Sequence, residues 1–409
     1  MSPADLPGER VTPRWIITVL LAGLSTLGPF SIDTYFPAFN AIAADLKASP
    51  LEMQQTLSIY LLGFAVMLLF HGALSDAFGR RPVVLVSLVV FAGASVACAL
   101  STSIHTLILW RLVQGLSAGA GMVVGRAIIR DLYGPVESQK MMSQVTMIFG
   151  LAPAIAPIIG GWLFIAFDWH AIFVFITAVS VLLFAASWRY LPESLPESLR
   201  QSFHPVPLAR SYRAVLLSRS FVLLSLAVGL NFCGFFVYIA SAPKFVQEML
   251  GLKPTEFAWL FLPGISGIMI GAYISGRTAG RLRPQQAVAV GYAVMGSAAL
   301  TNVAYNQFAP LSLPWVVMPI MLYTIGMSLA MPAITLLVLD MFPSMRGMAS
   351  SLQSFVSTFI NGLVSGILAP VLAFSHKTLA IGMLALLGMG ALCWISYLRF
   401  PKRVADERR

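Results

Sequence analysis

Two ionisable side chains lie in stretches of this sequence that are otherwise apolar enough to cross a membrane. Asp33 lies in Ser31-Ile-Asp-Thr-Tyr-Phe-Pro37, and Arg111 opens Arg111-Leu-Val-Gln-Gly115. A charge surrounded by hydrocarbon is costly, so such a residue must find a partner, find water or change its protonation state. Ionisable residues within membrane segments therefore indicate a functional site.

Asp33 is the only carboxylate that the sequence places in the interior of a predicted span, away from its end residues. Burial favours the neutral acid of a carboxyl group, which brings its titration closer to cellular pH. We therefore predict that Asp33 binds and releases a proton or another cation. The alternative is that Asp33 lies near the end of its span and is a solvated cap.

Arg111 is the only arginine placed clearly within a predicted span. Its guanidinium group cannot shed its charge by deprotonation, so it must reach acceptors or water. One role for Arg111 is static, tying its helix to backbone carbonyls or to Asp33.

The elements that must hold these residues are membrane helices. The chain has 409 residues, of which 58% are hydrophobic and 10% charged, and one soluble core cannot hide that much apolar surface. Apolar stretches of about 20 residues recur along the chain, which is the length that a helix needs to cross a bilayer. We predict an all-α membrane protein with twelve spans. They are residues 15–38, 53–71, 83–101, 106–128, 139–163, 171–190, 219–242, 256–276, 285–306, 314–339, 347–371 and 378–399.

The distribution of positive charge orients these spans. The net charge is +10, but the basic residues gather in alternate loops, which argues for membrane topology and against nucleic acid as a partner. If both termini are cytoplasmic, about 21 of the 26 Lys and Arg residues lie on the cytoplasmic side and about four on the other. We predict that both termini face the cytoplasm.

Hydropathy also divides the chain into halves. It falls between Tyr190 and Arg219, and six predicted spans lie on each side of this segment. Two six-helix bundles are therefore predicted at residues 1–190 and 219–409, joined by a cytoplasmic linker at 191–218. Such an arrangement is typical of transporters with a central site between related bundles.

A charged loop follows the second predicted span, with the sequence Gly72-Ala-Leu-Ser-Asp-Ala-Phe-Gly-Arg-Arg-Pro82. Gly72 and Gly79 allow close approach and turning, and Asp76 suits a helix N-terminus. Arg80 and Arg81 can receive phosphates or facing carboxylates. The loop resembles the G-x-L-x-D-x-x-G-R-R-P signature of the major facilitator superfamily of secondary transporters. Its role is either gating or only the fixing of topology.

Two further segments carry the resemblance. The Arg111 segment is similar to the R-x-x-Q-G motif of the superfamily's fourth helix, whose arginine is associated with proton transfer. The resemblance therefore implies that Arg111 takes part in proton coupling with Asp33. The fifth predicted span resembles the G-P-x-x-G-G signature of drug antiporters, although Ala156 stands where the family usually has glycine. Prolines bend such a helix, and glycines let another backbone approach. The residues concerned are Gly150, Pro153, Pro157, Gly160 and Gly161.

Three charges beside predicted spans are candidates for gating pairs. Asp131 could pair with Arg80 or Arg81, and Asp340 and Arg346 hold similar places in the second half. Exposed pairs of this kind contribute little to stability, so each could instead be an ordinary loop charge.

Polar and aromatic residues on several predicted helix faces suit an apolar pocket with a few orienting hydrogen bonds. The spacing of Asn231, Phe235 and Tyr238 places them on one face, and that of Gln353, Ser357 and Asn361 does the same. Each of these residues could also be ordinary packing. The full set is Tyr35, Tyr60, Phe64, Asn231, Phe235, Tyr238, Tyr323, Gln353, Ser357 and Asn361.

Together the first-half motifs resemble those of twelve-helix drug:proton antiporters, in particular the bicyclomycin and chloramphenicol resistance (Bcr/CflA) subfamily. The resemblance implies a bacterial inner-membrane exporter of small, often amphiphilic antibiotics, driven by protons. Two alternatives remain, an exporter of a native metabolite such as a sugar or amino-acid derivative, and a membrane-bound enzyme or receptor. Gly115-Leu-Ser-Ala-Gly119 matches a hydrolase pattern, but it lies in a predicted membrane helix without a strand.

The expected partners are a small-molecule drug, protons and the lipid bilayer, and the protein is expected to act as a monomer. The sequence contains no phosphate-binding loop, and its His and Cys residues lack the spacing of a metal motif. We therefore expect no cofactor, no metal and no catalytic residues, with the proton gradient as the source of energy.

Overall fold

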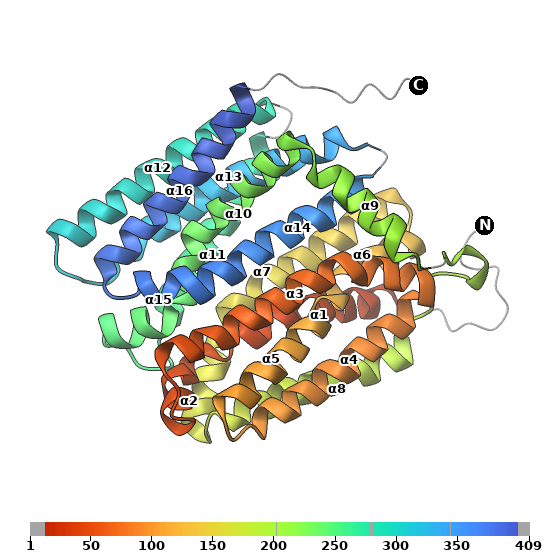
Figure 1. Cartoon of the computed structure of the whole chain (residues 1–409), viewed down its shortest axis with the longest axis horizontal. Coiled ribbons are helices and arrows are strands. Elements are labelled where there is room, and N and C mark those ends of the chain that lie inside the picture. Colours follow the sequence, from red (N-terminus) through yellow and green to blue (C-terminus); the bar gives the residue numbers. More distant parts are fainter. Residues whose placement is uncertain (1–12, 202, 279–280, 344, 400–409) are drawn as a thin grey trace. The chain divides into compact units, whose positions relative to one another are not determined.

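The computed structural model describes residues 13–399, except residues 202, 279–280 and 344 (Figure 1). The fold is 85% helical, with no strand in the described part. Twelve described helical segments are long and apolar enough to cross a membrane, which confirms the predicted number. Their bounds are Arg14–Asp45, Pro50–Phe78, Arg80–Ala99, Ile104–Leu132, Val136–Ala166, His170–Tyr190, Arg219–Ala240, Ala258–Thr278, Pro284–Phe308, Met318–Met341, Arg346–Leu372 and His376–Arg399.

The chain divides into two compact units. In the described part of the chain, the first contains residues 13–48 and 62–203, and the second contains residues 49–61 and 204–399. The change at residues 203 and 204 falls inside the predicted linker, so the first part of that linker belongs to the first unit. Residues 49–61 group with the second unit, whereas the sequence-based boundary assigned them to the first.

The first unit is built from the helices of the first six spans. Helix α1 packs against α6 and α7, and α4 packs against α5 and α8. The elements are α1 (Arg14–Asp33), η2 (Phe36–Ala38), α2 (Phe39–Asp45), α3 (Pro50–Phe78, from residue 62), α4 (Arg80–Ala99), α5 (Ile104–Ala118), α6 (Ala120–Leu132), α7 (Pro135–Ala166), α8 (His170–Tyr190) and η3 (Glu197–Leu199).

The second unit holds the remaining spans and one helix outside them, α9. Helix α10 packs against α13, α14 and α16, and α13 packs against α11 and α12. The elements are α9 (Pro205–Leu216), α10 (Arg219–Ala240), η4 (Lys244–Met249), α11 (Ala258–Thr278), α12 (Pro284–Phe308), α13 (Met318–Met341), α14 (Arg346–Leu363), η5 (Val364–Leu368), α15 (Ala369–Leu372) and α16 (His376–Arg399).

Two spans of the first unit are interrupted near the ionisable residues. The first span breaks directly after Asp33, where α1 ends, and Pro37 in the following short helix lacks a backbone N–H and cannot continue the helical hydrogen bonding. The fourth span breaks at Gly119, between α5 and α6. A broken membrane helix exposes polar backbone groups, which need partners supplied by neighbouring helices.

Candidate functional site

The break after α1 buries the Asp33 carboxyl group. The residue is 5% exposed, and its side chain forms no hydrogen bond or ion pair with any residue that the structure describes. The solvated cap considered from the sequence therefore does not describe its surroundings. A buried, unpaired carboxylate is unfavourable, so the site favours either the neutral acid or a bound cationic or hydrogen-bonding ligand.

Arg111 lies on α5 and reaches the same break. Its Nη1 atom donates to the Ser31 carbonyl oxygen at 3.4 Å and to Gln114 Oε1 at 2.5 Å, and its guanidinium lies 5.0 Å from the centre of the Tyr35 ring. Ser31 and Tyr35 stand two residues on either side of Asp33. Arg111 thus ties the fourth span to the backbone of the broken one, which is the carbonyl arrangement considered from the sequence.

A buried polar chain continues from Arg111 into α4. Gln114 Nε2 donates to Ser95 Oγ at 2.7 Å, and the Ser95 hydroxyl donates to the Phe91 carbonyl at 2.7 Å. Arg111, Gln114 and Ser95 are all fully buried. These hydrogen bonds hold the Nη1 end of the Arg111 side chain against α1 and α4.

Gly160 of α7 packs directly on the break in the first span. A Cβ atom on Gly160 would overlap the Thr34 carbonyl oxygen, so only glycine fits there without movement of the backbone. The residue predicted from the antiporter signature therefore supports the segment that carries Asp33. A side chain at Gly160 would push on the residue that follows the carboxyl group.

The other residues of the fifth-span signature have different surroundings. Helix α7 continues through both Pro153 and Pro157. A Cβ atom on Gly150 would meet nothing within 4 Å, whereas Gly161 is buried. Close backbone approach in this helix is thus demonstrated at Gly160 and is not required at Gly150.

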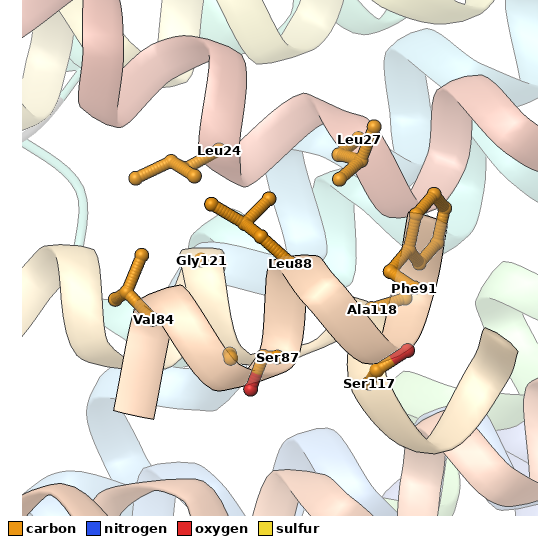
Figure 2. A pocket seen from close by; sticks show the side chains of 10 residues that line it. Leu24, Leu27, Val84, Ser87, Leu88, Phe91, Ser117, Ala118 and Gly121 are labelled. Carbon is orange, nitrogen blue, oxygen red and sulfur yellow. The ribbon is translucent and has the colours of Figure 1, made fainter. Parts of the chain in front are cut away.

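A small cavity of about 10 Å³ lies among α1, α4 and the junction of α5 and α6 (Figure 2). It is lined mainly by apolar side chains, including Leu24, Leu88 and Phe91, with the hydroxyls of Ser87 and Ser117 at its edge. A larger groove of about 610 Å³ in the same unit is bordered by α3, α4 and α5 and includes His71. In the described part of the chain, no titratable side chain lines the small cavity.

In the second unit, some of the predicted cavity residues meet around α10. Asn231 Nδ2 donates to the Tyr292 hydroxyl at 2.9 Å, and the Tyr323 hydroxyl donates to the Asn231 carbonyl at 2.8 Å. Two residues further along α10, Cys233 Sγ donates to Asn361 Oδ1 at 3.0 Å. The structure thus joins Tyr323 to Asn231 and places Asn361 against the same helix, α10.

Tyr238 belongs to a different polar cluster. Asn302 Nδ2 donates to the Tyr238 hydroxyl at 2.8 Å, Asn306 Nδ2 donates to Asn302 Oδ1 at 2.9 Å, and His376 Nδ1 lies 3.0 Å from Asn306 Oδ1. Tyr292, Asn302 and Asn306 were missed in the sequence. The signal was present, because Asn302 and Asn306 are separated by four residues and share one face of the otherwise apolar α12.

The remaining predicted cavity residues are mostly packing neighbours. Three of them pack closely on glycines of neighbouring helices. A Cβ atom added to Gly28 would lie 2.9 Å from the Phe64 ring, and one added to Gly264 would lie 2.8 Å from the Phe235 ring. A Cβ atom added to Gly229 would lie 3.3 Å from the Ser357 backbone. Tyr60 is fully buried. Gln353 is 5% exposed, and its Nε2 atom has no hydrogen-bond partner among the described residues, so it retains a free donor.

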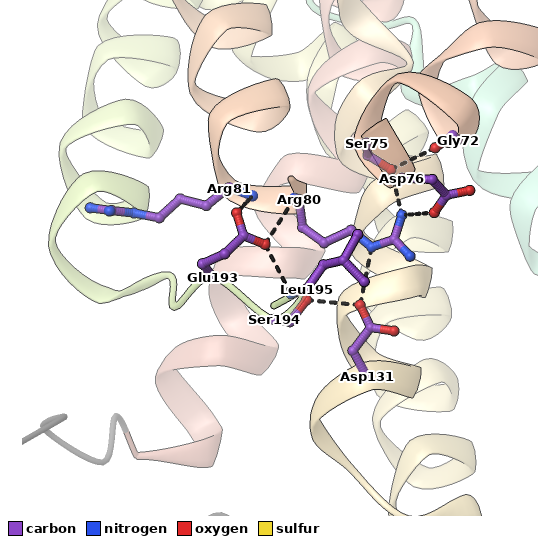
Figure 3. Close-up of polar contacts among 9 residues, drawn as sticks. All are labelled: Gly72, Ser75, Asp76, Arg80, Arg81, Asp131, Glu193, Ser194 and Leu195. Atoms are coloured by element: carbon purple, nitrogen blue, oxygen red, sulfur yellow. Dashed lines mark hydrogen bonds and ion pairs between the residues drawn. The ribbon is translucent and has the colours of Figure 1, made fainter. Parts of the chain in front are cut away.

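The charged signature loop is organised around Arg80 (Figure 3). Its guanidinium pairs with Asp76, donates to Ser75 Oγ at 2.7 Å and donates to Asp131 Oδ2 at 3.0 Å. The predicted pairing of Asp131 is therefore confirmed, with Arg80 as the partner. Arg80 joins the end of α3 to the end of α6 through two carboxylates.

The carboxylate at the N-terminus of α4 is Glu193, and the prediction of such a position for Asp76 was wrong. Asp76 lies in the last turn of α3, because that helix continues to Phe78. Glu193 accepts hydrogen bonds from the backbone N–H groups of Arg80 at 2.9 Å and Arg81 at 3.2 Å. A carboxylate there compensates unpaired N–H groups and the positive end of the helix dipole.

The glycines of the loop also differ from each other. Gly79 has φ +99°, in the left-handed region, and a Cβ atom there would lie 2.6 Å from the Glu193 carboxylate, so glycine is required twice over. At Gly72 a Cβ atom would meet only Val123, at an ordinary 3.8 Å. The expectation of close approach at Gly72 was therefore wrong.

The last predicted loop charges form weaker contacts. The Arg81 side chain points away from the Arg80 cluster (Figure 3). Its Nη2 atom donates to the Trp188 carbonyl at 2.6 Å. Arg346 Nη2 lies 3.5 Å from Asp340 Oδ1, with both side chains more than 60% exposed. This second-half pair exists, but its exposure leaves it little energetic weight.

The chain matches a known protein family. Residues 19–366 match the family described as Major Facilitator Superfamily. The chain belongs to this superfamily. Its members are membrane transporters, so the Arg80 cluster, the broken first span and the Gly160 contact are parts of a facilitator fold.

Relatives agree with that assignment, and a solved structure shares the fold. The chain is 35% identical to the uncharacterized MFS-type transporter YdgK of Bacillus subtilis (strain 168), over 77% of this chain and 79% of that protein. It is 31% identical to a bicyclomycin resistance protein homolog of Haemophilus influenzae, over 64% and 66% of the two chains. The fold is similar to that of a bacterial homolog of the human lysosomal transporter Spinster, with a TM-score of 0.71, 18% identity and coverage of 95% and 97%.

In this facilitator, Glu193→Ala is expected to lower the free energy of unfolding by about 1–2 kcal/mol, because two N–H groups at the start of α4 lose their acceptor. Thermal unfolding of the purified protein measures the effect. Glu197→Ala is the matched control, since Glu197 occupies the same place in the second Leu-Pro-Glu-Ser repeat but its side chain is 88% exposed. Equal stability of the two variants would contradict the assigned role of Glu193.

Proposed function

We propose that this protein exports small, often amphiphilic antibiotics across the bacterial inner membrane in exchange for protons, by alternating access. Asp33 carries the proposal: it is buried, unpaired among the described residues and placed at a helix break that Arg111 and Gly160 hold in position. The resemblance to drug antiporters and the name of the Haemophilus relative support the choice of substrate class. In this proposal both termini are cytoplasmic and the protein acts as a monomer.

In the proposed cycle, drug binding and protonation of Asp33 compete with each other. The ionised carboxylate favours the drug-bound form, and a proton arriving from the outer side neutralises Asp33 and releases the drug outward. A membrane potential contributes about 2.3 kcal/mol per charge per 100 mV, so one proton per cycle supports a useful drug gradient. No cofactor is needed, because the gradient supplies the energy.

Drug susceptibility tests the proposed substrate class. The chain is expressed in an antibiotic-hypersensitive bacterium, and growth is measured against a panel that includes bicyclomycin and chloramphenicol. We expect raised resistance to at least one amphiphilic antibiotic, together with proton-dependent efflux from proteoliposomes that contain this protein alone. Normal membrane expression without resistance to any drug in the panel would contradict drug export and favour a native metabolite.

Asp76→Asn is expected to slow transport and leave most drug affinity intact. The substitution removes one of the two carboxylates that pair with Arg80, while Asp131 still binds the guanidinium. The loop therefore stays folded but is held by one ion pair instead of two. Initial efflux rates and equilibrium drug binding are measured on the same preparation. Asp340→Asn, in the exposed second-half pair, serves as the control. If binding and transport fall equally in Asp76→Asn, the residue has a direct role in binding or folding.

A further inference from the structure

Helix α9 lies outside the membrane spans but is held at their edge. It ends at Leu216, and the span formed by α10 begins at Arg219. Three residues extend over at most about 10 Å, so the C-terminal end of α9 lies next to the surface of the bilayer. Contact with lipid headgroups is therefore within reach of this helix.

One face of α9 is packed on the protein. Val215 is fully buried and Tyr212 is half-buried, and burial raises the pKa of the Tyr212 hydroxyl to about 12. Within the second unit α9 contacts α10 and α14. These contacts fix which side of α9 points outward.

The opposite face combines apolar and basic side chains. Val206, Arg210, Arg213 and Leu217 follow one another at intervals of four, three and four residues, which places them on one face of the helix. Val206 is 66% and Leu217 74% exposed, and both arginines are exposed. Neither arginine forms an ion pair or hydrogen bond with another described residue.

We propose that this outer face of α9 binds anionic phospholipid headgroups. Arg210 and Arg213 would each donate to lipid phosphates, while Val206 and Leu217 enter the apolar layer at the edge of the headgroups. An acidic protein would satisfy the arginines, but it would not explain exposed apolar side chains tethered beside a membrane span. Each basic residue near an anionic surface is expected to favour contact about fivefold.

The test places a reporter on α9 and changes the lipid. Ala209 lies beside this face, and Ala209→Cys is labelled with a bimane fluorophore in the full-length protein carrying Cys393→Ala; Cys98 and Cys233 are buried. The protein is placed in nanodiscs that contain a lipid with a headgroup nitroxide, which quenches bimane on contact. One set is made with 30 mol% phosphatidylglycerol and the other with phosphatidylcholine alone.

We expect several-fold stronger quenching in the phosphatidylglycerol discs, and loss of most of that difference in 0.5 M NaCl. Arg210→Gln/Arg213→Gln should remove the difference, whereas the matched loss of two basic residues in Arg277→Gln/Arg281→Gln should preserve it. Equal quenching in both lipids would overturn the proposal, as would an equal effect of the two double variants. No drug is present, so the outcome is independent of the proposed export function.

Discussion

Replacing Asp33 with Asn is expected to abolish uphill drug efflux while the protein still reaches the membrane. Asn has nearly the same shape as the protonated acid but cannot titrate, so the variant can bind or passively exchange a neutral drug and cannot couple that exchange to protons. In the wild type, raising the pH ionises Asp33 and should strengthen drug binding, because proton and drug compete. In Asp33→Asn this pH dependence should disappear.

Efflux driven by an imposed pH gradient in proteoliposomes measures this loss. Asp45→Asn is the matched control, because Asp45 ends the same span and its carboxylate accepts a hydrogen bond from Trp169 at 3.0 Å that Asn can retain. The control should retain most uphill efflux. Wild-type uphill efflux by Asp33→Asn would remove Asp33 from the coupling mechanism and direct attention to the groups near Arg111.

Gly160→Leu is expected to reduce efflux by about tenfold or more, with protein still present in the membrane. Any side chain at this position overlaps the Thr34 carbonyl oxygen, so the substitution displaces the backbone directly after Asp33. Even Gly160→Ala should impair efflux, since the first added carbon already collides. Efflux rates are compared after normalisation to the amount of folded protein.

Helix α7 offers its own controls for this prediction. Gly150→Ala makes the same chemical change in the same helix, but its Cβ atom meets nothing within 4 Å, so efflux should be unchanged. Ala156→Gly restores the usual residue of the signature and should have a smaller effect than Gly160→Leu. If Gly160→Ala and Gly150→Ala transport equally well, close packing at Gly160 is not needed for transport.

The sequence was sufficient for the spans and for some contacts of the first unit. Hydropathy located all twelve spans because each must provide about 20 apolar residues in succession, a requirement that is local to the sequence. Asp33 and Arg111 could be identified for the same reason, since a charge within such a run has a high cost. The pairing of Asp131 with one of the two loop arginines followed from opposite charges at the ends of neighbouring spans, and the structure identifies Arg80 as the partner.

Other features depend on contacts that sequence spacing does not specify. Glu193 stands at the start of α4 because the chain returns there more than 100 residues later, and its exposed counterpart Glu197 has the same local sequence. Asp76 was expected at the start of a helix but lies in the last turn of α3, because α3 continues to Phe78. Sequence alone leaves a helix boundary uncertain by several residues. A pattern of glycines indicates close packing of helices, but it does not specify which backbone lies against Gly160. The structure shows that this backbone is that of Thr34 in the first span.

Proton release on drug binding tests the central claim most directly. Purified protein in weakly buffered solution is mixed with a neutral drug that it binds, and released protons are measured with a pH-sensitive dye. The proposal predicts release of up to one proton per drug bound, largest near the pH at which Asp33 is half protonated and absent in Asp33→Asn, which still binds the drug. Saturable drug binding with no proton release at any pH between 5 and 9, or equal release by Asp33→Asn, would contradict a mechanism in which drug and proton compete through Asp33.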